Sequence, residues 1–456
     1  MSQSTSQPTA QPTVRYHSTR LEPAEVFETL DRSILADGFR FVLDLEASRG
    51  TDLVDALTGR HYLDLFSFFA SNALGMNHPG LTEPAMRAEL GRVATHKPSN
   101  SDVYTVALAE FVDTFRRVLA DPALPHFFFI EGGALAIENA LKVAFDYKSR
   151  LNQSRGRSAA LGSQVMHLRY AFHGRSGYTM SLTNTDPVKT DRYPKFDWPR
   201  LTAPYIGTDR DGRPRDVAAL EAQAIAEAEA AFAANGDDIA AFICEPIQAE
   251  GGDHHFRPEF LQAIERIVHQ HEALFIVDEI QTGVGLTGTT WAYQQLGLHP
   301  DIVAFGKKTQ VCGIMAGRLV DTVPDNALVT SGRLNSTWGG NLTDMVRARR
   351  IMEVIEADHL VDHARQLGVW LLDQLRQLAG KYPGLMTDPR GRGLMCAFSL
   401  PSGRLRSEFF AGLLDHHVMM IGSGDRTVRF RPPLTVTQAE LAQGLAAIDA
   451  VLGQMG

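Results

Sequence analysis

ALFIVDEIQTGVGLTGTTWAYQQLGLHPDIVAFGKKTQVCGIMAG, residues 273–317, contains two short apolar runs that each end at a residue able to do chemistry. The first run, residues 273–277, is followed by Asp278, and the second, residues 301–305, is followed by a glycine and then Lys307. Short runs rich in Ile, Val and Phe predict buried strands of an α/β sheet, and ligands bind at the ends of such strands. The sequence therefore predicts a crevice that holds an acid and an amine.

An aspartate and a lysine in one crevice suit pyridoxal phosphate. A lysine can form a Schiff base with the cofactor's aldehyde once it has lost its proton, and burial lowers the pKa of an ammonium group far enough for that. A buried carboxylate keeps the pyridine nitrogen protonated, so that the ring can accept electrons. Lys307 and Asp278 are the predicted pair, although an Asp at a strand end and a later Gly-Lys also occur in α/β proteins without a cofactor.

Composition limits the class of protein. The chain has 456 residues, of which 44% are hydrophobic, and its net charge is -9. This length and composition predict two or three domains with a large core, and the charge argues against nucleic acid or an anionic membrane as the main partner. Three scattered cysteines indicate a reducing compartment and no metal knuckle. We expect a cytoplasmic protein with no metal, because the adjacent His254 and His255 lack a second cluster with ligand spacing.

The pattern along the chain predicts four segments. Residues 1–20, rich in Ser, Thr, Gln and Pro, predict a disordered tail rather than a signal peptide. Residues 21–80, with a hairpin around Thr58-Gly59, are expected to pack with the small domain. Residues 81–345 form the predicted large cofactor-binding domain. Residues 346–456 form the predicted small domain. A long helical run over 343–378 carries the chain into it, and it ends in a helix with a capping box at Thr437.

A phosphate seat is predicted where the apolar run FFFI is followed by EGGALAIENALK. A strand, a glycine turn and a helix N-terminus present unpaired backbone amides, which bind phosphate. Gly133 and Ala134 are the candidate phosphate-binding residues. The signal is weak by itself, since glycine turns before helices are common without any ligand.

Three further strand ends carry candidate ligand-binding side chains. Phe172 can stack on a flat ring and Arg175 can hold a carboxylate, although a core aromatic and a surface cation are the simpler interpretations of each alone. Glu250 follows the strand end at Glu245 by five residues and could equally be a solvated loop carboxylate. Arg429 precedes a pair of prolines and is a candidate anchor for a substrate carboxylate.

Two matches to nucleotide-binding motifs are rejected. Residues 283–288 match G-x-G-x-x-G, but the first glycine lies well past the strand end and no acidic residue closes a βαβ unit at the expected distance. Gly306-Lys307 lacks the upstream glycine of a Walker loop, because Asp301 occupies that position. Neither pattern predicts a nucleotide site.

Seven stretches follow one another along the chain: EGGALAIENALK, FHGRSG, CEPIQAEGG, VDEIQTGVGLTG, DIVAFGKK, NSTWGGN and VRFRPPL. This ordered set resembles the class III, or ω-amino, group of pyridoxal-phosphate aminotransferases over nearly the whole chain from about residue 21. Within the group, EGGALAIENA and GKKTQVCG resemble the L-lysine 6-aminotransferases, whereas most other members have a Ser-Gly-Thr-Glu type of turn and a glycine-rich continuation.

The resemblance implies a fold-type I α/β structure: a large domain with a mixed, mostly parallel sheet, a smaller α+β domain, and a homodimer with both sites at its interface. It implies that Lys307 binds the cofactor covalently, with Asp278 on the ring nitrogen and Gln281 near the ring hydroxyl. Phe172 would stack on the ring. The turn that would bind the phosphate lacks a hydroxyl side chain. The backbone amides of Gly133 and Ala134 would therefore hold the phosphate, together with Thr337 of the partner subunit.

The implied reaction transfers the terminal amino group of L-lysine to 2-oxoglutarate, giving L-2-aminoadipate 6-semialdehyde and L-glutamate. Glu250 would pair with Arg429 in the lysine half-reaction and release it to 2-oxoglutarate, while Arg175 would hold the carboxylate of lysine. Three alternatives remain: an ω-aminotransferase for ornithine, 4-aminobutyrate or a diamine; an aminomutase of the same fold; and a noncatalytic cofactor-binding protein.

Overall fold

The structure of the chain is a computed structural model that describes residues 19–209 and 212–456. The predicted disordered tail falls on residues 1–20, of which 1–18 lie outside the described residues. None of the helices in these two ranges combines the length and apolar character needed to cross a membrane. The helices are α1 (Val26–Asp31), α2 (Ser67–Ala70), α3 (Pro79–Thr82), α4 (Pro84–Ala94), α5 (Val106–Val118), α6 (Gly133–Ser154), α7 (Thr179–Leu182), α8 (Val217–Asn235), α9 (Ala249–Gly252), α10 (Pro258–Gln270), α11 (Leu342–Ala357), α12 (Leu360–Lys381), α13 (Gly403–Asp415) and α14 (Gln438–Met455).

The strands form one large sheet and three smaller ones, with the large sheet in the order β3-β11-β10-β9-β6-β4-β5. All of its neighbouring pairs are parallel except those of β11, which is antiparallel to both β10 and β3. The strands are β1 (Asp52–Val54), β2 (His61–Asp64), β3 (His126–Ile130), β4 (Gln164–Leu168), β5 (Arg200–Leu201), β6 (Ile239–Cys244), β7 (Ile247–Gln248), β8 (His254–His255), β9 (Leu274–Asp278), β10 (Ile302–Phe305), β11 (Cys312–Ala316), β12 (Thr387–Arg392), β13 (Met395–Ser399), β14 (Val418–Met419), β15 (Ile421–Ser423) and β16 (Thr427–Arg429).

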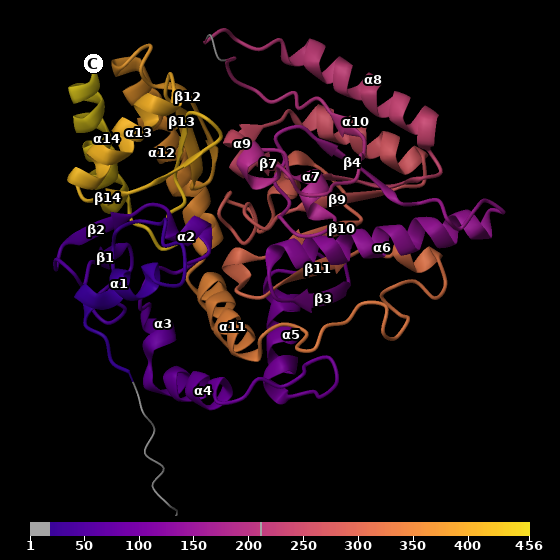
Figure 1. The fold of residues 1–456 in the computed structure, drawn as a ribbon, viewed down its shortest axis with the longest axis horizontal. Helices are drawn as coiled ribbons and strands as arrows, with labels where there is room; N and C mark the ends of the chain where they lie inside the picture. Colours follow the sequence, from indigo (N-terminus) through magenta and orange to yellow (C-terminus); the bar gives the residue numbers. More distant parts are fainter. Residues whose placement is uncertain (1–18, 210–211) are drawn as a thin grey trace, which may run out of the picture.

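Both faces of the large sheet are covered by helices, which explains why its central strands β6, β9, β10 and β11 are almost entirely apolar. Alternate residues of β9 enter different cores: Ile276 packs in a cluster with Ile137 and Leu141 of α6, and Phe275 packs in a second cluster with Phe260 of α10. In Figure 1 the large sheet lies on the right, with α6, α8 and α10 around it. This layering fixes the strand ends, and hence the residues after them, at one edge.

The C-terminal part of the chain forms a second region at the upper left of Figure 1, with α12, α13 and α14 beside an antiparallel sheet in the order β12-β13-β16-β15. Strand β14 of this region pairs in parallel with β2, so that Val418 lies opposite Leu63. This pairing supports our proposal that residues 21–80 pack with the C-terminal domain. The domain boundaries 81–345 and 346–456 stay a prediction, and the second of them falls within α11.

Several predicted elements are confirmed and one is wrong in extent. The predicted hairpin is β1 and β2, and the last helix, α14, has the expected capping box between Thr437 and Glu440. The run predicted as continuous over 343–378 is two helices, α11 and α12. The break lies at His359, whose φ of 51° is left-handed and therefore incompatible with a right-handed helix.

A buried carboxylate holds an unusual turn between the two regions. The four residues of α2 all have positive φ, from 37° at Ser67 to 65° at Ala70, a left-handed conformation that is costly for residues with a Cβ. The Oδ1 atom of Asp64 accepts hydrogen bonds from the backbone amides of Phe66 at 2.9 Å and Ser67 at 2.7 Å. Burial nevertheless raises the pKa of Asp64 to about 6, because these bonds only partly offset desolvation.

We expect Asp64→Asn to change the pH dependence of stability. The folded-state pKa of Asp64 lies above its unfolded value, so the protonated side chain stabilises the fold fully below the unfolded pKa. This stabilisation is lost as the pH rises through about 6. The free energy of unfolding of the wild type relative to the variant should therefore rise by about 1 kcal/mol from about pH 7.5 to about pH 5. Denaturant unfolding at both pH values measures this, and parallel profiles would contradict a raised pKa.

Candidate active site

The large sheet gathers its strand ends around one cavity. Strands β3, β4, β6, β9 and β10 run in the same direction, so the segments after them meet at one edge of the sheet. A cavity of about 500 Å³ lies there. Its lining contains most of the sequence-predicted site residues: Gly133, Ala134, Phe172, Arg175, Glu250, Asp278, Gln281 and Lys307.

Lys307 supplies the amine of this cavity. It follows β10 after Gly306 and has a φ of 53°, a strained value of the kind that clusters at functional sites. Burial lowers the pKa of Lys307, and the opposing charge of Asp278 only partly restores it. No hydrogen bond engages its amine among the residues the structure describes. The amine can therefore lose its proton more readily than an exposed lysine.

Asp278 ends β9 and is held in place by two contacts. Its Oδ1 atom accepts a hydrogen bond from the amide of Ile280 at 3.1 Å, and its Oδ2 atom lies 2.8 Å from Nδ1 of His173. Both side chains are buried. A second carboxylate, Glu245, lies nearby, and burial followed by the charge of Asp278 raises its pKa well above the ordinary range. The site thus disfavours ionisation of Glu245 and orients Asp278 through a histidine.

Glu245 connects two segments of the wall. Its Oε1 atom accepts from the amide of Phe172 and its Oε2 atom from the amide of Ala249, each at 3.0 Å. It therefore fixes the loop that carries the predicted stacking aromatic to the start of α9, which carries Glu250. His173 and Glu245 were not assigned roles from the sequence. The signal for both was a position at a predicted strand end, His173 directly beside Phe172 and Glu245 five residues before Glu250.

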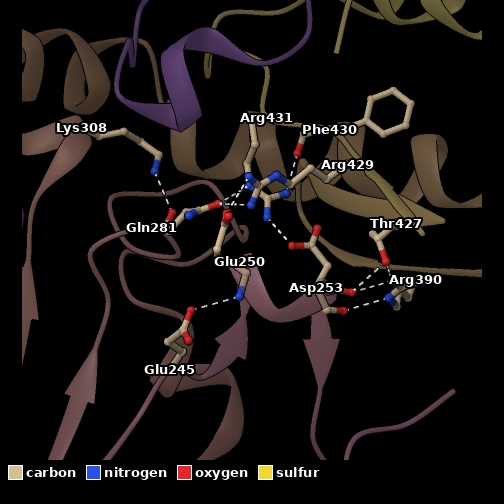
Figure 2. Close-up of polar contacts among 12 residues, drawn as sticks. Glu245, Glu250, Asp253, Gln281, Lys308, Arg390, Thr427, Arg429, Phe430 and Arg431 are labelled. Atoms are coloured by element: carbon tan, nitrogen blue, oxygen red, sulfur yellow. Dashed lines mark hydrogen bonds and ion pairs between the residues drawn. The ribbon is translucent and has the colours of Figure 1, made fainter. Parts of the chain in front are cut away.

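Glu250 is bound by two cations. Its Oε2 atom accepts from Arg429 at 2.9 Å, and its Oε1 atom accepts from Lys189 at 2.5 Å. Burial alone would raise the pKa of Glu250, but Arg429 and Lys189 together bring it below the ordinary value. Figure 2 shows the Arg429 side of this contact. Arg429 lies on β16, in the small domain, so the pair joins the two parts of the molecule at the cavity.

Gln281 is oriented by two arginines. Its side-chain oxygen accepts from Nε of Arg431 at 2.9 Å and from Arg429 at 3.4 Å (Figure 2). Arg431 is itself fixed by Asp253, whose Oδ1 atom lies 2.5 Å away, with both side chains fully buried. This arrangement turns the Gln281 amide nitrogen away from the arginines, where it can donate to another acceptor.

The N-terminus of α6 borders the same cavity and offers unpaired amides. Gly132 precedes the helix with a φ of 92°, and no side chain caps the helix end. The first amides of this 22-residue helix, at Gly133 and Ala134, face a site where an anion is favoured by both hydrogen bonding and the helix dipole. An amine, a carboxylate, an aromatic and an uncapped helix end therefore fit a cofactor with an aldehyde, a basic ring and a phosphate.

Two predicted residues are exposed. Arg175 lies at the mouth of the cavity and forms no hydrogen bond or ion pair with another described residue. Thr337 does not line the cavity and is exposed, next to Trp338, whose ring lies 3.8 Å from the amine of Lys97. The single chain therefore brings Arg175 to the site but leaves Thr337 outside it.

Comparison with known proteins gives a consistent result. The family model described as aminotransferase class-III matches residues 36–452. The chain is 61% identical over 433 residues to the L-lysine-epsilon aminotransferase of Mycobacterium tuberculosis, covering 94% of this chain and 96% of that protein. It is 55% identical to the L-lysine-epsilon aminotransferase of Amycolatopsis lactamdurans, covering 95% and 96%. The solved structure of lysine aminotransferase from M. tuberculosis superposes with a TM-score of 0.93 at 59% identity, covering 96% of this chain and all of that one.

Proposed function

Because the chain belongs to the class-III aminotransferase family, we propose that it transfers the terminal amino group of L-lysine to 2-oxoglutarate. The products are L-2-aminoadipate 6-semialdehyde and L-glutamate. The predicted family, the fold-type I class and the cofactor, pyridoxal phosphate, are confirmed. The contact that carries the proposal is the ion pair between Glu250 and Arg429 beside Lys307, because it lets one site serve two different amino donors.

The residues of the cavity can be assigned to the parts of the cofactor. When bound, pyridoxal phosphate supplies an aldehyde that takes up the substrate's amine and a ring that withdraws electrons from the adjacent carbon. Asp278, oriented by His173, would hold a proton on the ring nitrogen. Gln281 would donate its amide hydrogen to the ring hydroxyl oxygen, and Phe172 would lie against the ring face.

The phosphate would be bound at two places. The backbone amides of Gly133 and Ala134, at the uncapped start of α6, supply donors without a hydroxyl side chain. Thr337, exposed in the single chain, would complete the phosphate site from the partner subunit of a homodimer. Sedimentation of the purified protein tests the dimer.

Lys307 has two tasks in the proposed reaction. Its amine would hold the cofactor and would be free again once the substrate's amine is bound. The released Nζ atom, whose pKa is lowered by burial, then takes a proton from the substrate carbon that bears the amine. A lowered pKa leaves a larger fraction of this amine uncharged at a given pH than in an ordinary lysine.

Glu250 and Arg429 adapt the site to its two substrates. While paired with Glu250, Arg429 presents no free positive charge to the lysine chain. When a 2-oxo acid binds, its distal carboxylate would replace Glu250 on Arg429, since arginine binds carboxylates in a fork geometry. Arg175, at the mouth, would hold the carboxylate of lysine.

The proposal is tested by the visible absorption band of the protein-bound cofactor. L-Lysine added without an oxo acid should remove the band, and 2-oxoglutarate should restore it. A band that ignores lysine but responds to ornithine or 4-aminobutyrate would keep the chemistry and overturn the substrate. A response that needs no oxo acid at any stage would indicate an aminomutase instead.

We expect Glu250→Gln to slow the lysine half-reaction on the order of tenfold more than the glutamate half-reaction, because it leaves the buried charge of Arg429 unpaired when lysine is bound. Single-turnover absorbance changes with each amino donor measure the two rates. Glu229→Gln, at an exposed position of α8, is the control. Equal losses in both half-reactions would contradict a switching role for Glu250.

A further inference from the structure

The carboxylate of Glu250 lies between two cations that come from opposite sides. Arg429 belongs to the small domain, whereas Lys189 belongs to the short 3-10 helix Pro187–Lys189 of the large domain. The side chain of Lys189 is only 23% exposed, and its amine also lies 5.4 Å from the centre of the Phe172 ring. Lys189 therefore reaches into the wall of the active site rather than into solvent.

The segment that carries Lys189 is fixed by its own contacts. The side chain of Asp186 accepts a hydrogen bond from the amide of Val188 at 3.0 Å, which starts the short helix. The amine of Lys195 donates to the carbonyl oxygen of Thr190 at 2.8 Å, just after the helix ends. These contacts place Lys189 without help from Glu250.

Lys189 changes how Arg429 binds Glu250. An arginine can bind a carboxylate through two parallel hydrogen bonds, one to each oxygen. Here Arg429 donates to Oε2 through one terminal nitrogen, its other terminal nitrogen lies 3.4 Å from the side-chain oxygen of Gln281, and Oε1 accepts from Lys189. The Nε atom of Arg429 is buried and has no hydrogen-bond partner among the described residues. The contact between Glu250 and Arg429 is therefore a single hydrogen bond, and Nε of Arg429 is left as a donor for a second one.

We propose that Lys189 is a positioning residue with two effects on Glu250. It weakens the ion pair between Glu250 and Arg429, and it stays bound to Glu250 when Glu250 moves away from Arg429. This rests on the proposed function, in which a 2-oxo acid displaces Glu250 from Arg429. By binding Oε1, Lys189 prevents the tighter two-bond contact. Once Glu250 moves away, Lys189 remains its partner, so no unpaired carboxylate is left in a largely buried site. Lys189 thus favours binding of the oxo acid.

The test uses glutarate, an unreactive dicarboxylate, titrated into the holoenzyme by calorimetry. Lys189→Met should weaken glutarate binding on the order of tenfold. Without Lys189, the pair of Glu250 and Arg429 can gain one charge-assisted hydrogen bond, which glutarate must then replace. The KM for 2-oxoglutarate should rise by a similar factor, while the KM for lysine should change by less than about threefold. Lys189→Arg should restore most of the affinity, and Lys195→Met, which disturbs the same segment without touching Glu250, should leave it unchanged.

The same substitution in a Glu250→Gln background decides whether Lys189 acts through Glu250. No further loss of glutarate affinity in that background is expected. An equal loss there would mean that Lys189 contacts the dicarboxylate itself, and an unchanged affinity in the single variant would mean that it has no role; both overturn the proposal. If the wild type fails to transaminate lysine, the proposed function fails, but the glutarate comparison still decides the role of Lys189.

Discussion

Lys307→Ala is expected to lower kcat for the transfer from lysine by at least about 10³-fold, while the protein still folds and binds pyridoxal phosphate noncovalently. A positioned base contributes about 10²–10⁴ to a rate, and the lost covalent attachment adds to that. The substitution removes the amine that burial has prepared for proton transfer. Steady-state turnover and the absorption spectrum of the bound cofactor measure the two effects separately.

The neighbouring lysines provide controls for this result. Lys142→Ala, at an exposed position of α6, should leave turnover unchanged. Lys308 is buried and its amine donates to the backbone oxygen of Gln281 at 3.0 Å, so this amine is not free for the role proposed for Lys307. If Lys307→Ala kept full activity, the assignment would be wrong and Lys308 would be the next residue to replace.

Asp278→Asn is expected to lower kcat by about 10²–10³-fold, with a much smaller effect on folding. Removing one partner of a buried charge pair costs about 3–5 kcal/mol. Here that cost would destabilise the protonated form of the cofactor ring, which the reaction needs. The asparagine keeps a hydrogen-bonding oxygen for the amide of Ile280 but carries no charge. The rate of each half-reaction measures the effect, because both use the same ring.

Two comparisons separate this role from general damage to the site. Asp373→Asn, at an exposed position of α12, should be silent. His173→Gln, which keeps a side chain able to hydrogen-bond to Asp278, should lose much less activity than Asp278→Asn, since the carboxylate charge remains. A turnover within a few-fold of the wild type in Asp278→Asn would remove Asp278 from the mechanism.

The local sequence was sufficient to predict where the buried strands end. Asp278 and Lys307 each follow an apolar run whose length and composition predict a buried strand, and parallel strands necessarily present their ends at one edge. The hairpin of β1 and β2 and the capping box of α14 were predictable for the same reason, because turns and caps are set by a few adjacent residues. The resemblance in motif order then supplied the family.

The sequence was less informative about breaks in a regular pattern. Residues 343–378 have continuous helical periodicity, and the left-handed residue His359 that divides them is a histidine rather than a glycine. The left-handed turn of α2 likewise contains no glycine. In neither place does the residue type signal the left-handed conformation. At α2 it is held by the carboxylate of Asp64 and by the bond from the Ser67 hydroxyl to the carbonyl oxygen of Arg431.

What the sequence determined by itself was the chemistry that each strand end could offer: an amine, a carboxylate, an aromatic ring and a set of amides. What only the tertiary structure decided was which of these groups touch. His173 lies 105 residues before Asp278, and Gln281 lies 150 residues before Arg431, yet each pair is in hydrogen-bond contact. The pairing of Glu250 with Arg429 was implied only by the family resemblance, and its pairing with Lys189 was not predicted at all. The physical reason is that a side chain's partner depends on how sheets and domains pack over long separations, and no local pattern encodes that distance.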